Sequence, residues 1–327
     1  MNLPIKVLGI GHYVPSKIVT NHDMEKIVET SDEWITSRTG IKERRKVTFE
    51  KTHDMAFLAS KEAIKKAKIN VQEIDLIICA TITENKKTPS VANLVGGMLG
   101  IENNLMSFDI NAACTGFIYA LEIASSLIQE KKFRKALVIG AETITNILNY
   151  EDRNTCILFG DGAGAMVIEK GTNKNLGYFY NSSRPDMNQV LDIGDKIKMD
   201  GRKVFLFAVD IIEKSINQVL KQSKMKLEDF DNVIPHQANE RIISAVAKSM
   251  QVDKDFFFTN LEKYGNTSAA SIPIALSEYK ASNPKSSRLI LVGFGGGFTF
   301  GAAINGSCLG LFAISCCCTS AMCFFTL

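Results

Sequence analysis

The sequence predicts an α/β protein made of two duplicated halves. Short apolar segments alternate with amphipathic helical segments, for example at 54–68, 116–132 and 209–221, which is the pattern of layered sheets and helices. Four blocks of the first half recur in the same order in the second half, three of them at a shift of about 155 residues. A chain of 327 residues is also long enough to build two cores of ordinary size.

The repeat consists of four paired blocks, each a strand or a strand-to-helix junction. The pairs are 74–81 with 230–237, 110–121 with 265–276, 134–140 with 287–293, and 159–164 with 294–299. A single pair could arise between any two buried strands, but order and spacing together indicate an internal duplication. The second pair aligns Asn111 with Asn266.

The duplication sets the expected domain boundaries. We expect one half over residues 1–170 and a second over 171–304, with the core of the second half beginning near residue 200. Residues 171–198 are rich in Asn, Gly and Asp with weak periodicity, which predicts a loop or cover segment. Residues 305–327 are set apart by their composition.

Charge and cysteine usage exclude several classes of protein. The formal net charge is +3 and the basic residues are scattered, which argues against a nucleic-acid-binding protein. The N-terminal residues lack the apolar stretch of a signal peptide. Cys79, Cys114 and Cys156 are isolated from one another, which fits a reducing cytoplasm rather than a disulfide framework.

Cys114 is the first candidate for chemistry. It follows the strand-like residues 107–110 and precedes residues 115–121, where apolar spacing becomes helical. A thiol at such a junction lies at the positive end of a helix dipole, worth about half a unit charge, which favours the thiolate. The sequence therefore predicts a nucleophile, with a small buried structural residue as the alternative.

His236 and Asn266 are the second and third candidates. His236 ends the apolar run 232–234 and precedes a helix that contains Arg241, and strand ends are where α/β sheets present reactive groups. Asn266 also precedes a helix, where its structural alternative is an N-cap. If a pseudo-twofold axis relates the halves, Asn266 and Cys114 converge.

Six segments of the sequence resemble the motifs of a known protein family. They are TSDEWITSRTGI at 30–41, NAACTGF at 111–117, FGDGAG at 159–164, PHQAN at 235–239, YGNTSAAS at 264–271 and GFGGGFT at 293–299. Together they strongly resemble 3-oxoacyl-[acyl-carrier-protein] synthase III of bacterial type II fatty acid synthesis. The resemblance spans residues 3–304 in order and with similar spacing.

The resemblance implies a fold and a reaction. The fold is the thiolase-like αβαβα sandwich of two duplicated halves, assembled as a homodimer in the cytoplasm. Cys114, His236 and Asn266 fall on the family's catalytic set. Cys114 would take an acyl group from acyl-CoA, and malonyl acyl carrier protein would lose CO₂ and attack that thioester, with no cofactor and no metal.

The roles of these groups follow from where charge develops. Decarboxylation places negative charge on the malonyl thioester oxygen, which His236 Nε2 and the Asn266 amide can stabilise. The resemblance assigns a second oxyanion hole to the backbone N–H groups of Cys114 and Gly296. Glycines at 295–297 allow the close backbone approach that this requires.

The resemblance also implies binding residues. Those for coenzyme A and its pantetheine arm are Thr30, Trp34, Arg38, Arg153, Arg202, Phe205 and Asn239. Trp34 and Arg153 would lie on either side of the adenine with Arg38 near the phosphates, because aromatic and guanidinium planes both stack on a base. The acyl pocket would be lined by Thr88 from the partner subunit, Ile144, Phe159 and Phe294.

Two residues are expected to dock the carrier protein. Arg241 and Lys248 lie two helical turns apart on the helix after His236, so they share a face that can steer an acidic partner. A solvated charged face without a partner is the alternative.

Other functions compete with this interpretation. A papain-like protease also has Cys, His and Asn in this order, but it has neither this duplication nor these residues around its cysteine. A non-catalytic thiolase-fold regulator would have a damaged catalytic set, and here the set is intact. A thiolase-fold acyltransferase of a secondary pathway remains an alternative.

Residues 305–327 depart from the family. They carry no charge and contain five cysteines. We considered a membrane tail anchor, which the interspersed Ser, Thr and Gly argue against, and a metal site, which the adjacent cysteines at 316–318 do not suit. We favour a non-native or frame-altered terminus that contributes nothing to catalysis.

Overall fold

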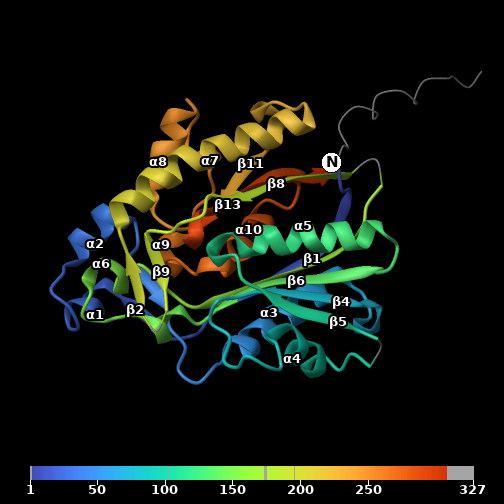
Figure 1. Ribbon diagram of the computed structural model, residues 1–327, viewed down its shortest axis with the longest axis horizontal. Coiled ribbons are helices and arrows are strands. Elements are labelled where there is room, and N and C mark those ends of the chain that lie inside the picture. Colours follow the sequence, from blue (N-terminus) through green and yellow to red (C-terminus); the bar gives the residue numbers. More distant parts are fainter. Residues whose placement is uncertain (1, 103, 173–174, 195, 308–327) are drawn as a thin grey trace, which may run out of the picture.

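The computed structural model describes residues 2–102, 104–172, 175–194 and 196–307. Figure 1 shows two sheets with helices between them and on both outer faces, which confirms the predicted αβαβα sandwich. The outer layers are α3 (Thr52–Ala67) with α4 (Val91–Met98), and α7 (Gly201–Ser223) with α8 (Glu240–Ser249). The middle layer contains α5 (Gly116–Gln129) and α10 (Ser271–Ser282).

The first sheet is built from residues of the first half. Its strands are β1 (Ile5–Tyr13), β4 (Leu76–Ala80), β5 (Met106–Ile110), β6 (Lys135–Glu142) and β7 (Gly162–Lys170), in the order β1-β7-β6-β4-β5. β6, β4 and β5 run parallel, whereas β7 is antiparallel to both β6 and β1. Strand β4 and residues 136–141 of β6 are apolar because helices cover both of their faces.

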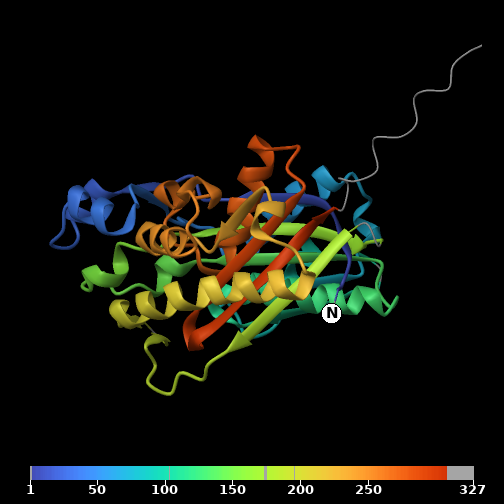
Figure 2. The same ribbon diagram turned by 90° about the horizontal axis from the view of Figure 1, so that it is seen from above.

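The second sheet repeats this arrangement. Its strands are β8 (Asn175–Ser183), β11 (Asn232–Pro235), β12 (Arg288–Gly295) and β13 (Thr299–Ser307), in the order β11-β12-β13-β8. β11 is parallel to β12, and β13 is antiparallel to both β12 and β8. Seen from above, α7 lies across these strands (Figure 2). The duplication read from the sequence is therefore present in strand order and direction.

The prediction that residues 171–198 form a loop or cover was wrong. β8 pairs along its whole length with β13, as β1 pairs with β7, so it is a full member of the second sheet. Its periodicity is weak because it is an edge strand with several half-exposed positions. The rest of the segment holds the hairpin β9 (Leu191–Ile193) and β10 (Ile197–Met199).

Two smaller expectations also needed correction. The helix expected from residue 209 starts at Gly201, where the Asp200 side chain accepts a hydrogen bond from Lys203 N and caps it. The fourth repeat block is displaced, because Phe294 lies inside β12 whereas Phe159 precedes β7.

The two halves meet through backbone as well as side chains. A side chain on Gly140 of β6 would place its Cβ 2.3 Å from the carbonyl oxygen of Ala269, so glycine is required there. Ala269 belongs to η6 (Ser268–Ala270), a short 3₁₀ turn that leads into α10. This close contact fixes the end of one half's central strand against a turn of the other half.

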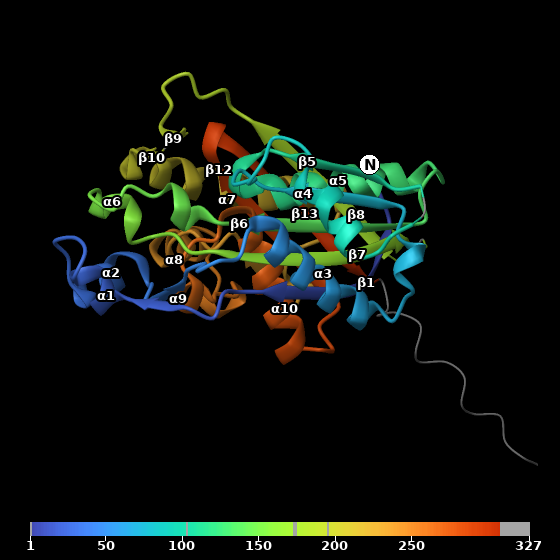
Figure 3. The same ribbon diagram turned by 90° about the horizontal axis from the view of Figure 1, so that it is seen from below.

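Smaller elements gather at one end of the sandwich (Figure 3). They are α1 (Asn21–Glu25), α2 (Asp32–Thr39), α6 (Arg153–Cys156), α9 (Leu261–Tyr264), and the pair β2 (Ile18–Thr20) and β3 (Glu43–Arg45). Further 3₁₀ turns are η1 (Val71–Glu73), η2 (Ala113–Thr115), η3 (Ile144–Ile147), η4 (Leu227–Asp229), η5 (Lys254–Phe256) and η7 (Gly296–Phe298).

The uncharged C-terminal tail is the remaining segment for which we made a prediction. Residues 308–327, which hold all five of its cysteines, lie outside the described residues. Across the part of the chain that the structure covers, no helix combines the length and apolar character needed to cross a membrane.

Candidate active site

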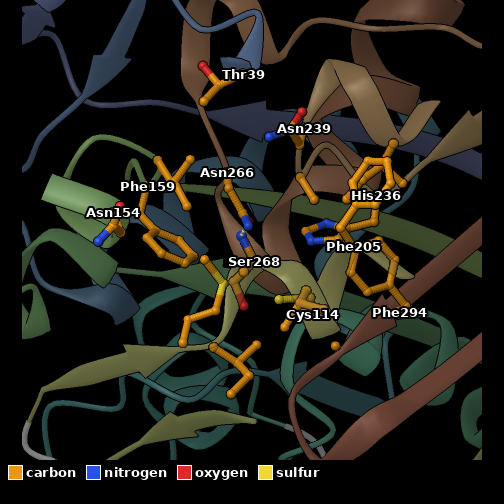
Figure 4. A pocket seen from close by; sticks show the side chains of 18 of the residues that line it. Thr39, Cys114, Asn154, Phe159, Phe205, His236, Asn239, Asn266, Ser268 and Phe294 are labelled. Atoms are coloured by element: carbon orange, nitrogen blue, oxygen red, sulfur yellow. Dashed lines mark hydrogen bonds between the residues drawn. The ribbon is translucent and has the colours of Figure 1, made fainter. Parts of the chain in front are cut away.

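A cavity of about 480 Å³ opens among these smaller elements at the ends of both sheets. Cys114, His236 and Asn266 all line it, and their side chains converge from three separate loops (Figure 4). All three are buried. The cavity brings Cys114 together with two residues that are more than 120 positions away from it in the chain.

Cys114 lies in the turn η2, directly before α5. The turn is tied to the other half by Thr299, whose hydroxyl donates to Ala112 O at 3.0 Å and lies 3.1 Å from the Thr115 hydroxyl. Ala113 adopts a positive φ of 47°, which turns the backbone sharply before the nucleophile. Cys114 is therefore held at a helix N-terminus, as its sequence position indicates.

The ionisation of Cys114 differs from the sequence-based expectation. Burial raises the pKa of Cys114 to about 12, as does the nearby Glu142 carboxylate, and hydrogen bonds with the Ser268 side chain and the backbone N–H of Cys114 only partly oppose this. The free protein therefore holds a neutral thiol at neutral pH. Burial of the sulfur therefore opposes the thiolate that the helix N-terminus is expected to favour.

His236 follows β11 and is fixed at both its backbone and its ring. Its N–H donates to Val292 O at 2.8 Å, and its Nδ1 lies 2.6 Å from the Ser271 hydroxyl. Phe294 packs edge-on against the ring, with centroids 5.4 Å apart. Burial lowers the pKa of His236 to about 3, so the imidazole is neutral. If Ser271 donates to Nδ1, Nε2 carries the proton and can donate to a ligand in the cavity.

Asn266 is held by backbone hydrogen bonds to the first half. Its N–H donates to Leu158 O at 2.8 Å and its carbonyl accepts from Gly160 N at 3.0 Å. Its Oδ1 accepts from Ser268 N at 2.8 Å, so the amide nitrogen remains to donate into the cavity. The preceding Gly265 has a φ of 63°, which a side chain would strain.

The glycine-rich loop reaches the nucleophile through Gly295. A Cβ on Gly295 would lie 2.7 Å from Cys114 N, so only glycine allows this approach. Gly295 lines the cavity, and Gly296, the predicted oxyanion donor, follows it in η7 close to the Ala113 side chain.

Most predicted coenzyme A residues line the cavity, namely Trp34, Arg38, Arg202, Phe205 and Asn239. Asn239 caps α8 by accepting from Arg241 N, and its amide donates to Arg38 O at 3.1 Å. Thr30 and Arg153 are not among the lining residues. The Thr30 hydroxyl is buried and has no hydrogen-bond partner among the described residues.

Trp34 is flanked by two cations. The guanidinium carbons of Arg38 and Arg153 lie 5.0 Å and 4.9 Å from the centroid of its ring. Arg153 also donates to Glu29 O at 3.1 Å. Because Arg153 is in direct contact with Trp34, an adenine can enter between them only if Arg153 moves.

The remaining predicted residues divide between the cavity and the surface. Ile144, Phe159 and Phe294 are buried and line the cavity. Thr88 is exposed and is not a lining residue of its own chain's cavity. Arg241 is exposed at the cavity mouth, and Lys248 is exposed two turns further along α8.

Sequence reasoning missed Ser268, Ser271 and Glu142. Ser268 lines the cavity beside Cys114, and Ser271 fixes the His236 ring. Glu142 is fully buried at the end of β6, where it accepts a hydrogen bond from Ser268. Ser268 and Ser271 lie in the segment 264–271 that also contains Asn266, so that segment could have indicated them. No sequence pattern around Glu142 indicated a functional role. Within the described residues, no cluster of His, Cys, Asp and Glu could hold a metal ion.

Comparisons with known proteins agree with this geometry. Residues 108–183 match the family model of 3-oxoacyl-[acyl-carrier-protein] synthase III, and residues 220–306 match the model of its C-terminal part. The beta-ketoacyl-[acyl-carrier-protein] synthase III of Acholeplasma laidlawii is 53% identical over 93% of this chain and 98% of its own. That of Clostridium novyi is 45% identical, over 91% and 97%.

Solved structures are similar over the same extent. The 3-oxoacyl-[acyl-carrier-protein] synthase III of Aquifex aeolicus superposes with a TM-score of 0.89 at 45% identity, covering 92% of this chain and 99% of that one. The Thermus thermophilus synthase III gives 0.88 at 34% identity, covering 92% and 98%.

Proposed function

Because the chain belongs to the 3-oxoacyl-[acyl-carrier-protein] synthase III family, we propose that Cys114, His236 and Asn266 carry out the reaction of this acyltransferase. The enzyme condenses an acyl-CoA with malonyl acyl carrier protein and so initiates fatty acid synthesis. The observation that carries the assignment is the convergence of these three side chains, from both halves, in one buried cavity.

The first half-reaction loads the acyl group onto Cys114. The sulfur loses its proton and forms a bond to the carbonyl carbon of the acyl-CoA, and the bond from that carbon to the CoA sulfur breaks. The developing oxyanion needs two N–H donors, for which we propose the backbone of Cys114 and Gly296. The close approach of Gly295 to Cys114 N supports this assignment, because it brings the two backbone segments together.

The second half-reaction forms the carbon–carbon bond. The malonyl group loses CO₂, and the electrons released give an enolate whose oxygen is bound by His236 Nε2–H and the Asn266 amide. The enolate carbon attacks the acyl carbonyl, the bond to Cys114 Sγ breaks, and 3-oxoacyl carrier protein leaves. The low pKa of His236 supports a hydrogen-bond donor rather than a cation at neutral pH.

Separate sets of residues would bind coenzyme A and the acyl group. Those that would bind coenzyme A are Trp34, Arg38, Arg153, Arg202, Phe205, Asn239 and Thr30. Ile144, Phe159 and Phe294 would contact a short or branched starter, and their bulk near Cys114 supports a short one. The energy comes from the thioester substrate, so we propose that no cofactor takes part.

The assembly and location are proposals that rest on the family. We infer a cytoplasmic homodimer in which Thr88 reaches the acyl pocket of the partner subunit. Its exposure outside its own chain's cavity supports that role. We also place the carrier protein on the face of α8 that holds Arg241 and Lys248.

The test is a product analysis. The protein is incubated with malonyl carrier protein and a panel of acyl-CoAs of different length and branching, and the products are identified by mass spectrometry. We expect 3-oxoacyl carrier protein from short or branched starters. Release of free acids without carbon–carbon bond formation would contradict the function.

A further inference from the structure

A buried hydrogen-bonded chain leads from the nucleophile to a carboxyl group that the reaction above does not use. Glu142, the last residue of β6, is 0% exposed. Its Oε2 accepts from the hydroxyls of Thr83 at 2.5 Å and Thr81 at 3.3 Å, and Ile82 N donates to both carboxyl oxygens. Its Oε1 accepts from the Ser268 hydroxyl at 3.2 Å.

Ser268 connects this carboxyl to Cys114. A hydrogen bond with its side chain lowers the pKa of the Cys114 thiol against the effect of burial, and the two residues lie side by side in the cavity (Figure 4). The Asn266 side chain holds Ser268 N at 2.8 Å, and Ser268 has a positive φ of 49°. A thiol, a hydroxyl and a carboxyl group thus follow one another, and the middle group is held in place by its own backbone.

The alternative acceptor for the thiol proton is His236, and its surroundings do not suit that task. Burial lowers the pKa of His236 to about 3, and Nδ1 is engaged by Ser271. Burial raises the pKa of Glu142 to about 7, partly opposed by its hydrogen bonds. A base works best when its pKa is close to the working pH, which favours the carboxyl.

The two cysteines that face Glu142 do not titrate in this range. Cys114 in η2 and Cys79 on β4 both face the carboxyl, and burial raises the pKa of each above its ordinary value. Asp109 lies beyond Cys79 on β5 and is engaged by the N–H groups of Val91 and Ala92. Near neutral pH, Glu142 therefore changes charge whereas Cys114 and Cys79 stay neutral.

We propose that Glu142 takes up the Cys114 thiol proton through the Ser268 hydroxyl during acylation. The Cys114 proton moves to Ser268 Oγ while the Ser268 hydroxyl proton moves to Glu142 Oε1. The sulfur then bonds to the acyl carbonyl carbon, and the CoA sulfur leaves with its bonding electron pair and takes the proton back by the same route. Glu142 contacts no reacting atom, so it is a positioning residue for this proton. The inference rests on the proposed function, since it requires an acyl group to be loaded on Cys114.

The test compares E142Q and S268A with the parent protein. The rate at which iodoacetamide alkylates Cys114 is followed against pH by peptide mass spectrometry. In the parent, the rate should rise up to about pH 7 and level off above it, because Glu142 has then lost its proton. In both variants the rate should keep rising through about pH 8 without levelling off, because a thiol with a pKa of about 12 ionises in proportion to hydroxide over this range. Acylation by acyl-CoA at about pH 8 should slow in both variants on the order of 10² with little change in KM. Malonyl decarboxylation should change far less than acylation.

S125A is the matched control. Ser125 is a buried serine of α5 whose hydroxyl donates to Leu121 O at 2.6 Å, away from the cavity lining. Its loss should leave the pH profile unchanged, because it removes a buried hydroxyl without breaking the chain to Glu142.

The outcomes separate this inference from the proposed function. E142Q and S268A whose alkylation rates level off at about pH 7, as in the parent, would overturn the inference. S268A retains the carboxyl and its threonine donors, so it decides the matter even if E142Q does not fold. A parent protein that makes no 3-oxoacyl product would overturn the proposed function instead. A parent that condenses normally, with variants whose alkylation rates still level off at about pH 7, would overturn the proton route alone.

Discussion

The two turns that meet at the cavity have one backbone design and different chemistry. In η2 the Asn111 side chain accepts from Ala113 N at 3.2 Å, and in η6 the Asn266 side chain accepts from Ser268 N at 2.8 Å. Ala113 and Ser268 have nearly the same positive φ, 47° and 49°. Each turn continues into a buried central helix, α5 or α10.

The difference lies in what each turn carries and what it packs against. The first turn holds Cys114 where the second has Ala269, and it packs against Gly295 at the end of β12. The second turn holds Ser268, which binds Glu142 at the end of β6. The duplicated halves therefore provide two turns with the same backbone conformation. One turn carries the Cys114 thiol and the other carries the Asn266 amide and the Ser268 hydroxyl, and together these groups form a single site.

The largest expected effect comes from removing the thiol. C114A should reduce condensation on the order of 10⁴ or more, because no other group near the acyl carbonyl can form the covalent intermediate. The fold should remain, since the change removes one small group. Radiolabel transfer from acyl-CoA and circular dichroism measure the two effects.

A second substitution tests whether the turns are interchangeable. Adding A269C to C114A places a thiol at the equivalent position of the other turn. Activity should not return, because Ala269 is buried against Gly140 and does not line the cavity. Recovery of condensation would show that the turns are equivalent in chemistry as well as in backbone.

The next largest effect separates the half-reactions. H236A and N266A should each slow malonyl decarboxylation on the order of 10², and slow acylation of Cys114 much less, because both groups stabilise the enolate. Decarboxylation and acylation are measured separately, with each carrier or CoA substrate alone. Equal losses in both steps would instead make His236 the base for the thiol.

Stability should depend on pH through Glu142. Its folded pKa, about 7, lies above the ordinary value of 4.5, so its neutral form stabilises the fold below about pH 4.5, and this stability is lost as the pH rises through about 7. The shift corresponds to roughly 3 kcal/mol in the free energy of unfolding. In E142Q, the free energy of unfolding should not fall in this way between about pH 5 and about pH 8. Urea unfolding at the two pH values measures the difference. The parent and E142Q showing the same pH dependence would argue against the buried carboxyl as its cause.

The smallest effect is expected outside both turns. R241E combined with K248E should raise the KM for malonyl carrier protein about three- to tenfold and leave acylation by acyl-CoA almost unchanged. Added salt should raise the parent's KM in the same direction, because exposed charges are screened. An unaltered KM at low salt would remove α8 as the docking face.

The parts of the site that the sequence predicted share one property. Cys114 and His236 each follow a strand, and Asn266 directly precedes a turn that leads into a helix, so each position can be recognised within one segment of the sequence. The duplication then indicated that two of them converge. Strand β4 and residues 136–141 of β6 were also predictable from the sequence, because both are runs of apolar residues.

The parts that escaped prediction depend on distant contacts. Glu142 and Ser268 are 126 residues apart, and only packing of β6 against η6 brings them together. β8 lacks a strand pattern because it is an edge strand, and its place is set by β13. The high pKa of Cys114 comes from burial by both halves, which a helix-dipole argument from local sequence omits.

The most direct measurement is intact-protein and peptide mass spectrometry of a single turnover. After addition of acyl-CoA alone, the protein should gain one acyl group, carried by the peptide that contains Cys114. Subsequent addition of malonyl carrier protein should remove it and release an equal amount of 3-oxoacyl carrier protein. An acyl group on another residue, such as Cys156, or one that malonyl carrier protein does not discharge, would contradict the account.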